Sequence, residues 1–327
     1  MSDPFQVIFR GVRGSIPTPV SAEQMQEKLA KALELATPED LKDAASRQAF
    51  IDGLPMEIRA CFGGNSSCVQ VQAGEEMLIF DAGTGIRPLG LELMQCQFGK
   101  GQGRGHIFFS HTHWDHIQGF PFFVPLYVKG NHFTLNFPLA NLHERLQGQQ
   151  FHEFFPVPFE AYSASLEFTD LKDKCEIRIG DVRITWKEMY HPDKSFSYRV
   201  EYGGKSVIYA TDAEYQNLSP EELKPNIDFF QDADLLIFDS MYTFGEGLEK
   251  RDWGHSSTFI GVDLAVDANV KQIAFYHHEP TYSDFKLVDI LKQTEKYIKP
   301  IAPDSNLNMF LAYEGLTVDL MQDGSQG

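Results

Sequence analysis

The 327-residue sequence has few cysteines, few basic residues and no long hydrophobic run, and each of these absences excludes a class of protein. No stretch approaches the roughly eighteen uninterrupted apolar residues of a membrane span, so we expect no membrane protein. The first residues, Met1–Phe5, contain neither a basic region nor a long apolar one, so we expect no signal peptide and a cytoplasmic location. The four cysteines have no CxxC spacing and are interpreted as free thiols.

The sequence is also poor in positive charge. It has 28 basic and 46 acidic residues, which gives a formal net charge of −18. A field of this sign repels polyanions, and the sequence has no dense cluster of Lys and Arg to oppose it. We therefore expect a small anionic substrate rather than a nucleic acid as the binding partner.

The most informative motif is the sequence SHTHWDH at residues 110–116, which directly follows a strand-like apolar run. Imidazole and carboxylate are ligands that zinc and similar divalent metals prefer. Residues two apart on an extended segment point the same way, so His111 and His113 can bind one metal ion. Asp115 and His116 follow and can face a second ion. The alternative is a polar surface turn, but this density of metal-binding side chains favours a metal site.

Three later segments also end a strand-like apolar run with a side chain that can bind a metal. His191, Asp212 and His277 each stand at such an end, and His278 is an alternative to His277. Side chains at the ends of successive strands converge at one edge of a sheet, where a site can form from residues far apart in sequence. A carboxylate at the position of Asp212 is well placed to bridge two ions.

Strand-like and helical patterns alternate along the chain without a repeat or a clear linker. This organisation predicts a single α/β domain over residues 1–327. Between residues 21 and 54 the pattern becomes helical, with Met25, Leu29 and Leu33 at helical spacing and Thr37 and Pro38 as the start of a second helix. We interpret residues 21–54 as a helical insertion, either a lid or a dimerisation element.

The order HxHxDH, then His, Asp and His, resembles the metallo-β-lactamase superfamily. The resemblance implies a four-layer αββα sandwich with a hydrolytic site for one or two metals, and it spans nearly the whole chain. Within the superfamily, several further segments look like the branch that is similar to the transfer-RNA 3′-processing nucleases (tRNase Z) and the cyclic-nucleotide phosphodiesterases of this fold. These segments are Gly11–Pro17, Gly63–Cys68, Asp81–Gly90, Trp253–Ser256 and His277–Pro280.

The resemblance assigns a set of ligands for two divalent metal ions, zinc in the first place and manganese or iron as alternatives. The first ion would be bound by His111, His113 and His191, and the second by Asp115, His116 and His277, with Asp212 bridging. His277 is preferred to His278 because the first histidine of this ending is the ligand in the family. Asp81 resembles the family's Asp behind the metal loop, which fixes the tautomer of a ligand histidine.

The resemblance also implies three catalytic residues. His255 matches the histidine that serves phosphodiesterase members as a phosphate contact or proton donor. Asp239 matches the acidic residue of the His-Glu-Ala-Thr motif and would orient His255, although a helix cap is an alternative role for Asp239. Asp115, together with Asp212, would position a hydroxide held by the two metals for attack on phosphorus.

Three departures from the nuclease pattern guide the choice of substrate. The flexible arm of tRNase Z is not visible between His116 and His191, Phe238 stands where the nuclease motif has His, and the chain is acidic. We therefore predict a metal-dependent phosphodiesterase that acts on a small nucleotide or cyclic nucleotide. The alternatives are hydrolysis of a lactone, thioester or β-lactam, a tRNase Z-like ribonuclease, and a metal-binding sensor without activity.

Two smaller expectations complete the prediction. A homodimer is expected from the phosphodiesterase relatives, which are often dimers. The remaining histidines have no partner spacing and are interpreted as structural or exposed; they are His106, His132, His143 and His152.

Overall fold

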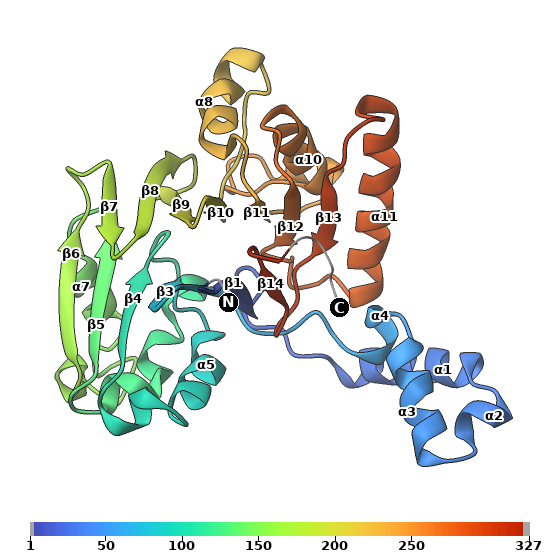
Figure 1. The fold of residues 1–327 in the computed structure, drawn as a ribbon, viewed down its shortest axis with the longest axis horizontal. Helices are drawn as coiled ribbons and strands as arrows, with labels where there is room; N and C mark the ends of the chain where they lie inside the picture. Colours follow the sequence, from blue (N-terminus) through green and yellow to red (C-terminus); the bar gives the residue numbers. More distant parts are fainter. Residues whose placement is uncertain (1–2, 323–327) are drawn as a thin grey trace.

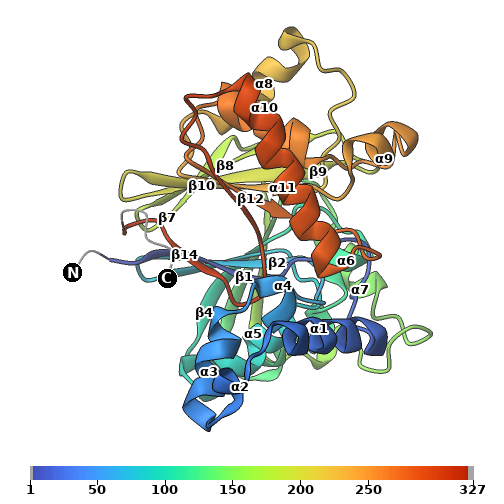
Figure 2. The same ribbon diagram turned by 90° about the vertical axis from the view of Figure 1, so that its right-hand side faces the viewer.

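The computed structural model describes residues 3–322, which form two seven-stranded sheets packed face to face. Helices cover the outer face of each sheet, so the molecule has four layers in the order αββα (Figure 2). The predicted α/β class and αββα sandwich are therefore confirmed. No helix within residues 3–322 is long and apolar enough to cross a membrane.

The first sheet has the strand order β14-β1-β2-β3-β4-β5-β6, and its strands are parallel from β3 to β6 and antiparallel elsewhere. Helices α5 (Ile86–Leu93), α6 (Trp114–Ile117) and α7 (Leu142–Gly148) belong to this half of the molecule (Figures 1 and 2). Its strands are β1 (Phe5–Gly11), β2 (Cys68–Ala73), β3 (Glu76–Phe80), β4 (Arg104–Phe108), β5 (His132–Phe137), β6 (Ser165–Asp170) and β14 (Thr317–Asp319).

The second sheet has the order β13-β12-β11-β10-β9-β8-β7 and is parallel from β10 to β13. Its helices are α8 (Pro220–Phe230), α9 (Phe244–Glu249), α10 (Thr258–Asp267) and α11 (Asp284–Ile301). Because helices and the first sheet cover its two faces, the parallel strands are continuous hydrophobic runs. The strands are β7 (Glu176–Ile179), β8 (Val182–Met189), β9 (Ser195–Tyr202), β10 (Lys205–Ala210), β11 (Leu235–Asp239), β12 (Gln272–Tyr276) and β13 (Asn308–Leu311).

The main hydrophobic core lies between the two sheets. Phe80 and Phe108 of the first sheet stack at 5.3 Å between ring centroids, and both pack against Tyr198 of the second sheet. A second core lies between the second sheet and helices α8, α10 and α11. The two cores fix the sheets relative to each other, so loops that leave facing strands are held in register at the sandwich edge.

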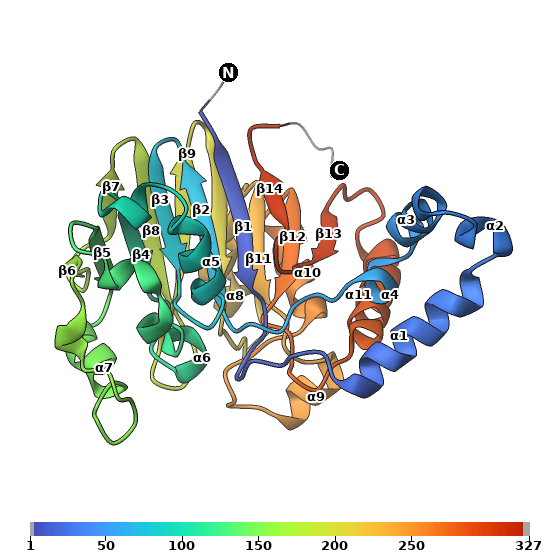
Figure 3. The same cartoon turned by 90° about the horizontal axis from the view of Figure 1, so that it is seen from below.

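Four helices between residues 22 and 59 stand apart from the sheets beside α11 (Figures 1 and 3). They cover the segment predicted to be helical, residues 21–54, and continue beyond it. Ser21 forms a capping box at the start of the first helix, and Thr37 precedes Pro38 at the start of the second. The helices are α1 (Ala22–Leu35), α2 (Pro38–Leu41), α3 (Ala44–Gly53) and α4 (Met56–Arg59).

One buried lysine connects this helical segment to the body of the protein. Lys28 is the buried residue of α1, and its Nζ lies 2.6 Å from Oδ2 of Asp284 at the start of α11. Lys28 also donates to the carbonyl of Ala60 at 2.8 Å. The other oxygen of Asp284 lies 3.5 Å from the Arg13 guanidinium. Asp284 is thus a buried anion shared by two buried cations.

We expect Asp284→Ala to lower the free energy of unfolding by about 3–5 kcal/mol, because it leaves two buried cations without their counter-charge. Urea unfolding followed by circular dichroism measures the effect. The control is Glu27→Ala, which removes the exposed partner of Lys31 one turn away. That exposed pair contributes less than about 1 kcal/mol. Equal losses in the two variants would contradict the role of Asp284.

Candidate metal centre

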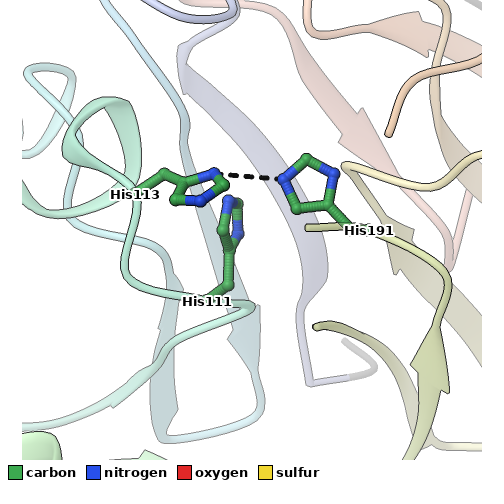
Figure 4. Close-up of side chains that lie close together, drawn as sticks. All are labelled: His111, His113 and His191. Atoms are coloured by element: carbon green, nitrogen blue, oxygen red, sulfur yellow. Dashed lines mark hydrogen bonds between the residues drawn. The ribbon is translucent and has the colours of Figure 1, made fainter. Parts of the chain in front are cut away.

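Three of the predicted metal ligands, His111, His113 and His191, lie together where β4 and β8 end (Figure 4). Nδ1 of His113 and Nε2 of His191 are 3.1 Å apart, and the three residues each offer a ring nitrogen within 4.8 Å of the others. His111 and His191 are buried, whereas His113 is exposed. The loop after β4 is extended, so the side chains of His111 and His113 point in the same direction, as their spacing predicted.

A second cluster combines Asp115 and His116 of α6 with His277 at the end of β12 and Asp212. All four side chains are buried. Oδ2 of Asp115 lies 3.1 Å from Nε2 of His277 and 3.2 Å from Nε2 of His116. The short helix α6 starts just after His113, so it turns the next two polar side chains toward the second sheet.

Asp212 lies between the two clusters with one carboxylate oxygen facing each. Its Oδ2 is 3.6 Å from Nε2 of His111 and 3.8 Å from Nε2 of His191. Its Oδ1 is 3.2 Å from Nε2 of His116 and 3.3 Å from Nε2 of His277. The backbone of Asp212 has a positive φ of 46°, a conformation that residues other than glycine adopt mainly at sharp turns and functional sites.

The charges in this region fit divalent cations. Within residues 3–322, the ion pairs of the four buried carboxylates Asp81, Asp115, Asp212 and Asp239 are with histidines and not with Lys or Arg. Burial alone would raise the pKa of Asp115 and Asp212, but the charge of His116 beside them holds both pKa values well below their usual range. A histidine that binds a metal ion carries no proton on the ligating nitrogen, so divalent cations would supply the positive charge that these carboxylates need.

Unsatisfied ring nitrogens point to the same conclusion. Nε2 of His111 and Nε2 of His116 are buried, face the clusters and have no hydrogen-bond partner among residues 3–322. A buried polar atom without a partner costs free energy, so it indicates a ligand that the protein chain itself does not supply. Nitrogen and oxygen donors without thiolate suit zinc, manganese or iron.

Asp81 supports the second cluster from behind. Its Oδ2 accepts a hydrogen bond from Nδ1 of His116 at 2.7 Å, which leaves Nε2 of that ring facing the cluster. Asp81 also accepts hydrogen bonds from Ser110 Oγ and from Tyr209 OH, each at 2.7 Å. Tyr209 could not be identified from the sequence, because it lies in the apolar strand β10 just before Asp212 and resembles an ordinary hydrophobic strand residue.

The turn after β1 also contributes to the site, a role that could not be assigned to it from the sequence. The backbone N–H of Ser15 donates to Oδ2 of Asp115 at 2.7 Å. A Cβ on Gly14 would lie 2.6 Å from the His277 ring, so only glycine permits this close approach. Arg13 anchors the turn, because its buried guanidinium donates to the carbonyls of Gly63 and Tyr282. The family resemblance of the segment Gly11–Pro17 was the one feature of the sequence that could have indicated this role.

His255 and Asp239 lie at the edge of the clusters. Nδ1 of His255 is 3.0 Å from Oδ2 of Asp239 and 3.9 Å from Oδ2 of Asp212. Burial alone would lower the pKa of His255, but the Asp239 carboxylate raises it to about 9, so the ring is held in its protonated form. Asp239 also accepts from the backbone N–H groups of Ala213 and Met241. It caps no helix, because the N-cap of α9 is Thr243.

The other histidines lie outside the clusters formed by residues 3–322. His278 is buried but turns away, with its Nε2 2.8 Å from the carbonyl oxygen of Ala312. His143 packs against Phe159 and Phe168, and the His152 side chain is 96% exposed. His106 and His132 face Glu76 and Glu167 on the first sheet.

Comparison with known proteins gives one family and a consistent group of relatives. Residues 77–278 match the family described as Beta-lactamase superfamily domain. Ribonuclease Z of Prochlorococcus marinus (strain NATL1A) is 31% identical over 117 residues, which is 36% of this chain and 32% of that protein. The chain thus matches about a third of the length of this relative.

Solved structures share the fold over almost the whole chain. The metallo-beta-lactamase fold protein YhfI from Bacillus subtilis is 16% identical, with a TM-score of 0.62, and the similarity covers 97% of this chain and 100% of that one. The short form of human tRNase Z is 14% identical, with a TM-score of 0.58, covering 96% of this chain and 99% of that one. The ribonuclease among the relatives is at odds with the expectation that nucleic acid is not a partner.

Proposed function

Because the chain belongs to the beta-lactamase superfamily and has its metallo-β-lactamase fold, we propose that it is a metal-dependent hydrolase that cleaves phosphodiesters in small nucleotides or cyclic nucleotides. The observation that carries the choice of phosphodiesters is the Asp239–His255 pair, held 3.9 Å from the Asp212 carboxylate. Hydrolysis of a lactone or β-lactam does not need a protonated histidine at this position. Hydrolysis of a phosphodiester does, because the histidine offsets negative charge on the phosphate and donates a proton to the leaving oxygen.

The two clusters are the proposed metal ligands. His111, His113 and His191 would hold one ion, Asp115, His116 and His277 the other, and Asp212 both. When bound, two divalent cations supply Lewis acidity for the phosphate oxygens and lower the pKa of water. We propose zinc as the native metal, since the donors are imidazole and carboxylate.

The chain's own residues would orient the substrate and move its protons. Asp239 accepts from Nδ1 of His255, which leaves Nε2 as the nitrogen that can donate to the leaving oxygen of the substrate. The protonated ring also offsets the negative charge that accumulates on phosphorus oxygens. The backbone N–H of Ser15 donates to Asp115 and fixes the orientation of its carboxylate. A fixed carboxylate can orient the groups bound in the second cluster.

A tRNase Z-like ribonuclease is the second candidate, and the match to ribonuclease Z from Prochlorococcus marinus favours it. Ribonuclease and small-molecule phosphodiesterase activities require the same bond cleavage. They differ in how the rest of the substrate is bound, and a net charge of −18 disfavours a long polyanion.

A substrate panel with metal removal tests the proposed function. We expect zinc-loaded protein to hydrolyse bis(p-nitrophenyl) phosphate and cyclic nucleotides, but not nitrocefin or an acyl-homoserine lactone. Dialysis against a chelator is expected to abolish this turnover, and added zinc is expected to restore it. The reason is that the histidine and carboxylate side chains of the two clusters cannot replace a metal ion as Lewis acid. Cleavage of a transfer-RNA precursor alone would favour the ribonuclease, and turnover of the lactone alone would overturn the proposal.

A further inference from the structure

A cavity of about 180 Å³ opens beside His255, and neither the metal clusters nor the proton donor accounts for it. It lies between α9, the start of α10 and the loop that follows Asp212. His255 lines the cavity and also contacts Asp239 in the site, so the cavity and the clusters share one wall. A substrate held at the clusters therefore has space for a substituent in this direction.

The outer part of the cavity is apolar and includes an aromatic ring. Phe244, Leu218 and Leu248 line it and are 42%, 49% and 68% exposed, which is unusual for large apolar side chains that lie together. The Phe244 ring stacks on Phe259 at 6.3 Å between centroids, and Phe259 stacks on Tyr297 at 4.4 Å. Phe244 is thus held from behind, with its side chain lining the cavity.

The inner part of the cavity carries hydroxyl groups without partners. Ser256 and Ser257 are each 2% exposed, and Tyr215 is 7% exposed. The side-chain oxygens of all three are buried and have no hydrogen-bond partner among residues 3–322. All three residues line the cavity. Buried hydroxyls are normally paired, so three unpaired hydroxyls in the wall of one cavity can serve a ligand with hydrogen-bonding groups on its edge once their side chains turn toward it.

We propose that this cavity binds the heterocyclic base of a nucleotide substrate, with the phosphate directed past His255 to the metal clusters. The proposal rests on the proposed phosphodiesterase function and specifies its substrate class. A base has an apolar face for Phe244 and Leu248 and a polar edge for the serine hydroxyls. The volume corresponds to about six water molecules at roughly 30 Å³ each, which suits a single ring system rather than a polymer. Arg251 lines the same cavity and offers N–H donors to the polar edge of a base.

The test compares two ligands that differ only in the base. Isothermal titration of zinc-loaded protein with adenosine 5′-monophosphate and with ribose 5-phosphate gives the contribution of the base, because both carry the same phosphate. We expect the first ligand to bind at least about ten-fold more tightly. Phe244→Ala removes the ring on which the base would stack, so it is expected to reduce this ratio by about ten-fold.

The serine hydroxyls provide a sharper test. They make no hydrogen bond within residues 3–322, so their removal is not expected to lower the stability of the fold. The double variant Ser256→Ala/Ser257→Ala is expected to retain its urea midpoint and to bind adenosine 5′-monophosphate at least about five-fold more weakly. Leu248→Ala is expected to weaken binding as well. Its matched control is Leu33→Ala on α1, where the leucine is 69% exposed and lies outside the cavity, and this change leaves binding as in the wild type.

The possible outcomes separate this proposal from the proposed function. Equal affinity for the two ligands, or a ratio that Phe244→Ala and the double serine variant leave unchanged, would overturn the base site even if the protein hydrolyses bis(p-nitrophenyl) phosphate. Preference for the nucleotide in a protein that hydrolyses no phosphodiester would support the base site and overturn the hydrolytic function.

Discussion

Asp212→Ala is expected to lower turnover of bis(p-nitrophenyl) phosphate by more than about a hundred-fold and to reduce the amount of bound metal. The reason is geometric, since the two oxygens of Asp212 face different histidine clusters, at 3.6 Å from His111 and 3.2 Å from His116. Changing a residue that only orients a metal ligand typically costs about 10–100-fold in metal affinity or activity. Loss of a carboxylate that serves both clusters exceeds this range.

Two measurements on the same sample decide this prediction. Turnover is followed by release of p-nitrophenolate, and metal per protein chain is counted by mass spectrometry after gel filtration. Asp228→Ala is the control, because Asp228 is an exposed carboxylate of α8 that pairs only with Lys224 among residues 3–322. Full metal content together with full turnover in Asp212→Ala would show that the two clusters do not act as one site.

The convergence of the clusters could be predicted from the sequence because each residue follows a local signal. His191, Asp212 and His277 each come just after a buried apolar run, and the structure confirms that the runs are strands β8, β10 and β12. These three strands run in the same direction, because β9 is antiparallel to both β8 and β10 and β11 is parallel to both β10 and β12, so their carboxyl ends lie at one edge of the sheet. The order of these ligands along the chain resembles that of the metallo-β-lactamase superfamily. That resemblance in turn predicted the four-layer fold.

The supporting contacts could not be predicted, because they join segments that are distant in sequence and have no local signal. Tyr209 reaches Asp81 across the two sheets, and Ser15 reaches Asp115 through a backbone N–H that any residue possesses. The pairing of β1 with β14 joins the two ends of the chain in the same way. Such contacts depend on the tertiary arrangement of strands and loops, which the hydrophobic pattern of a single strand does not determine.

The choice between substrates also lies beyond the sequence pattern. Net charge is a property of the whole chain, whereas a substrate meets only the residues around the site. The overall acidity of the chain disfavoured nucleic acid, yet the relatives include a ribonuclease. In the cavity beside His255, the side chains of Phe244, Ser256 and Arg251 come together only after α9 and α10 have packed.

His255→Ala is expected to lower turnover by about 10²–10⁴-fold, the usual contribution of a positioned proton donor, while leaving the metal content unchanged. The imidazole contacts Asp239 at 3.0 Å and is outside the two clusters assigned to the metal ions, although it forms further groups that could hold an ion with His191 and Asp212 and with Asp239 and His277. Asp239→Asn is expected to produce a smaller loss, because the asparagine still fills the space but no longer favours the protonated ring. His152→Ala is the matched control, since that side chain is 96% exposed, and it should retain wild-type turnover. If His255→Ala loses metal in proportion to activity, the residue is a metal ligand instead of a proton donor, in keeping with its 3.9 Å approach to Asp212.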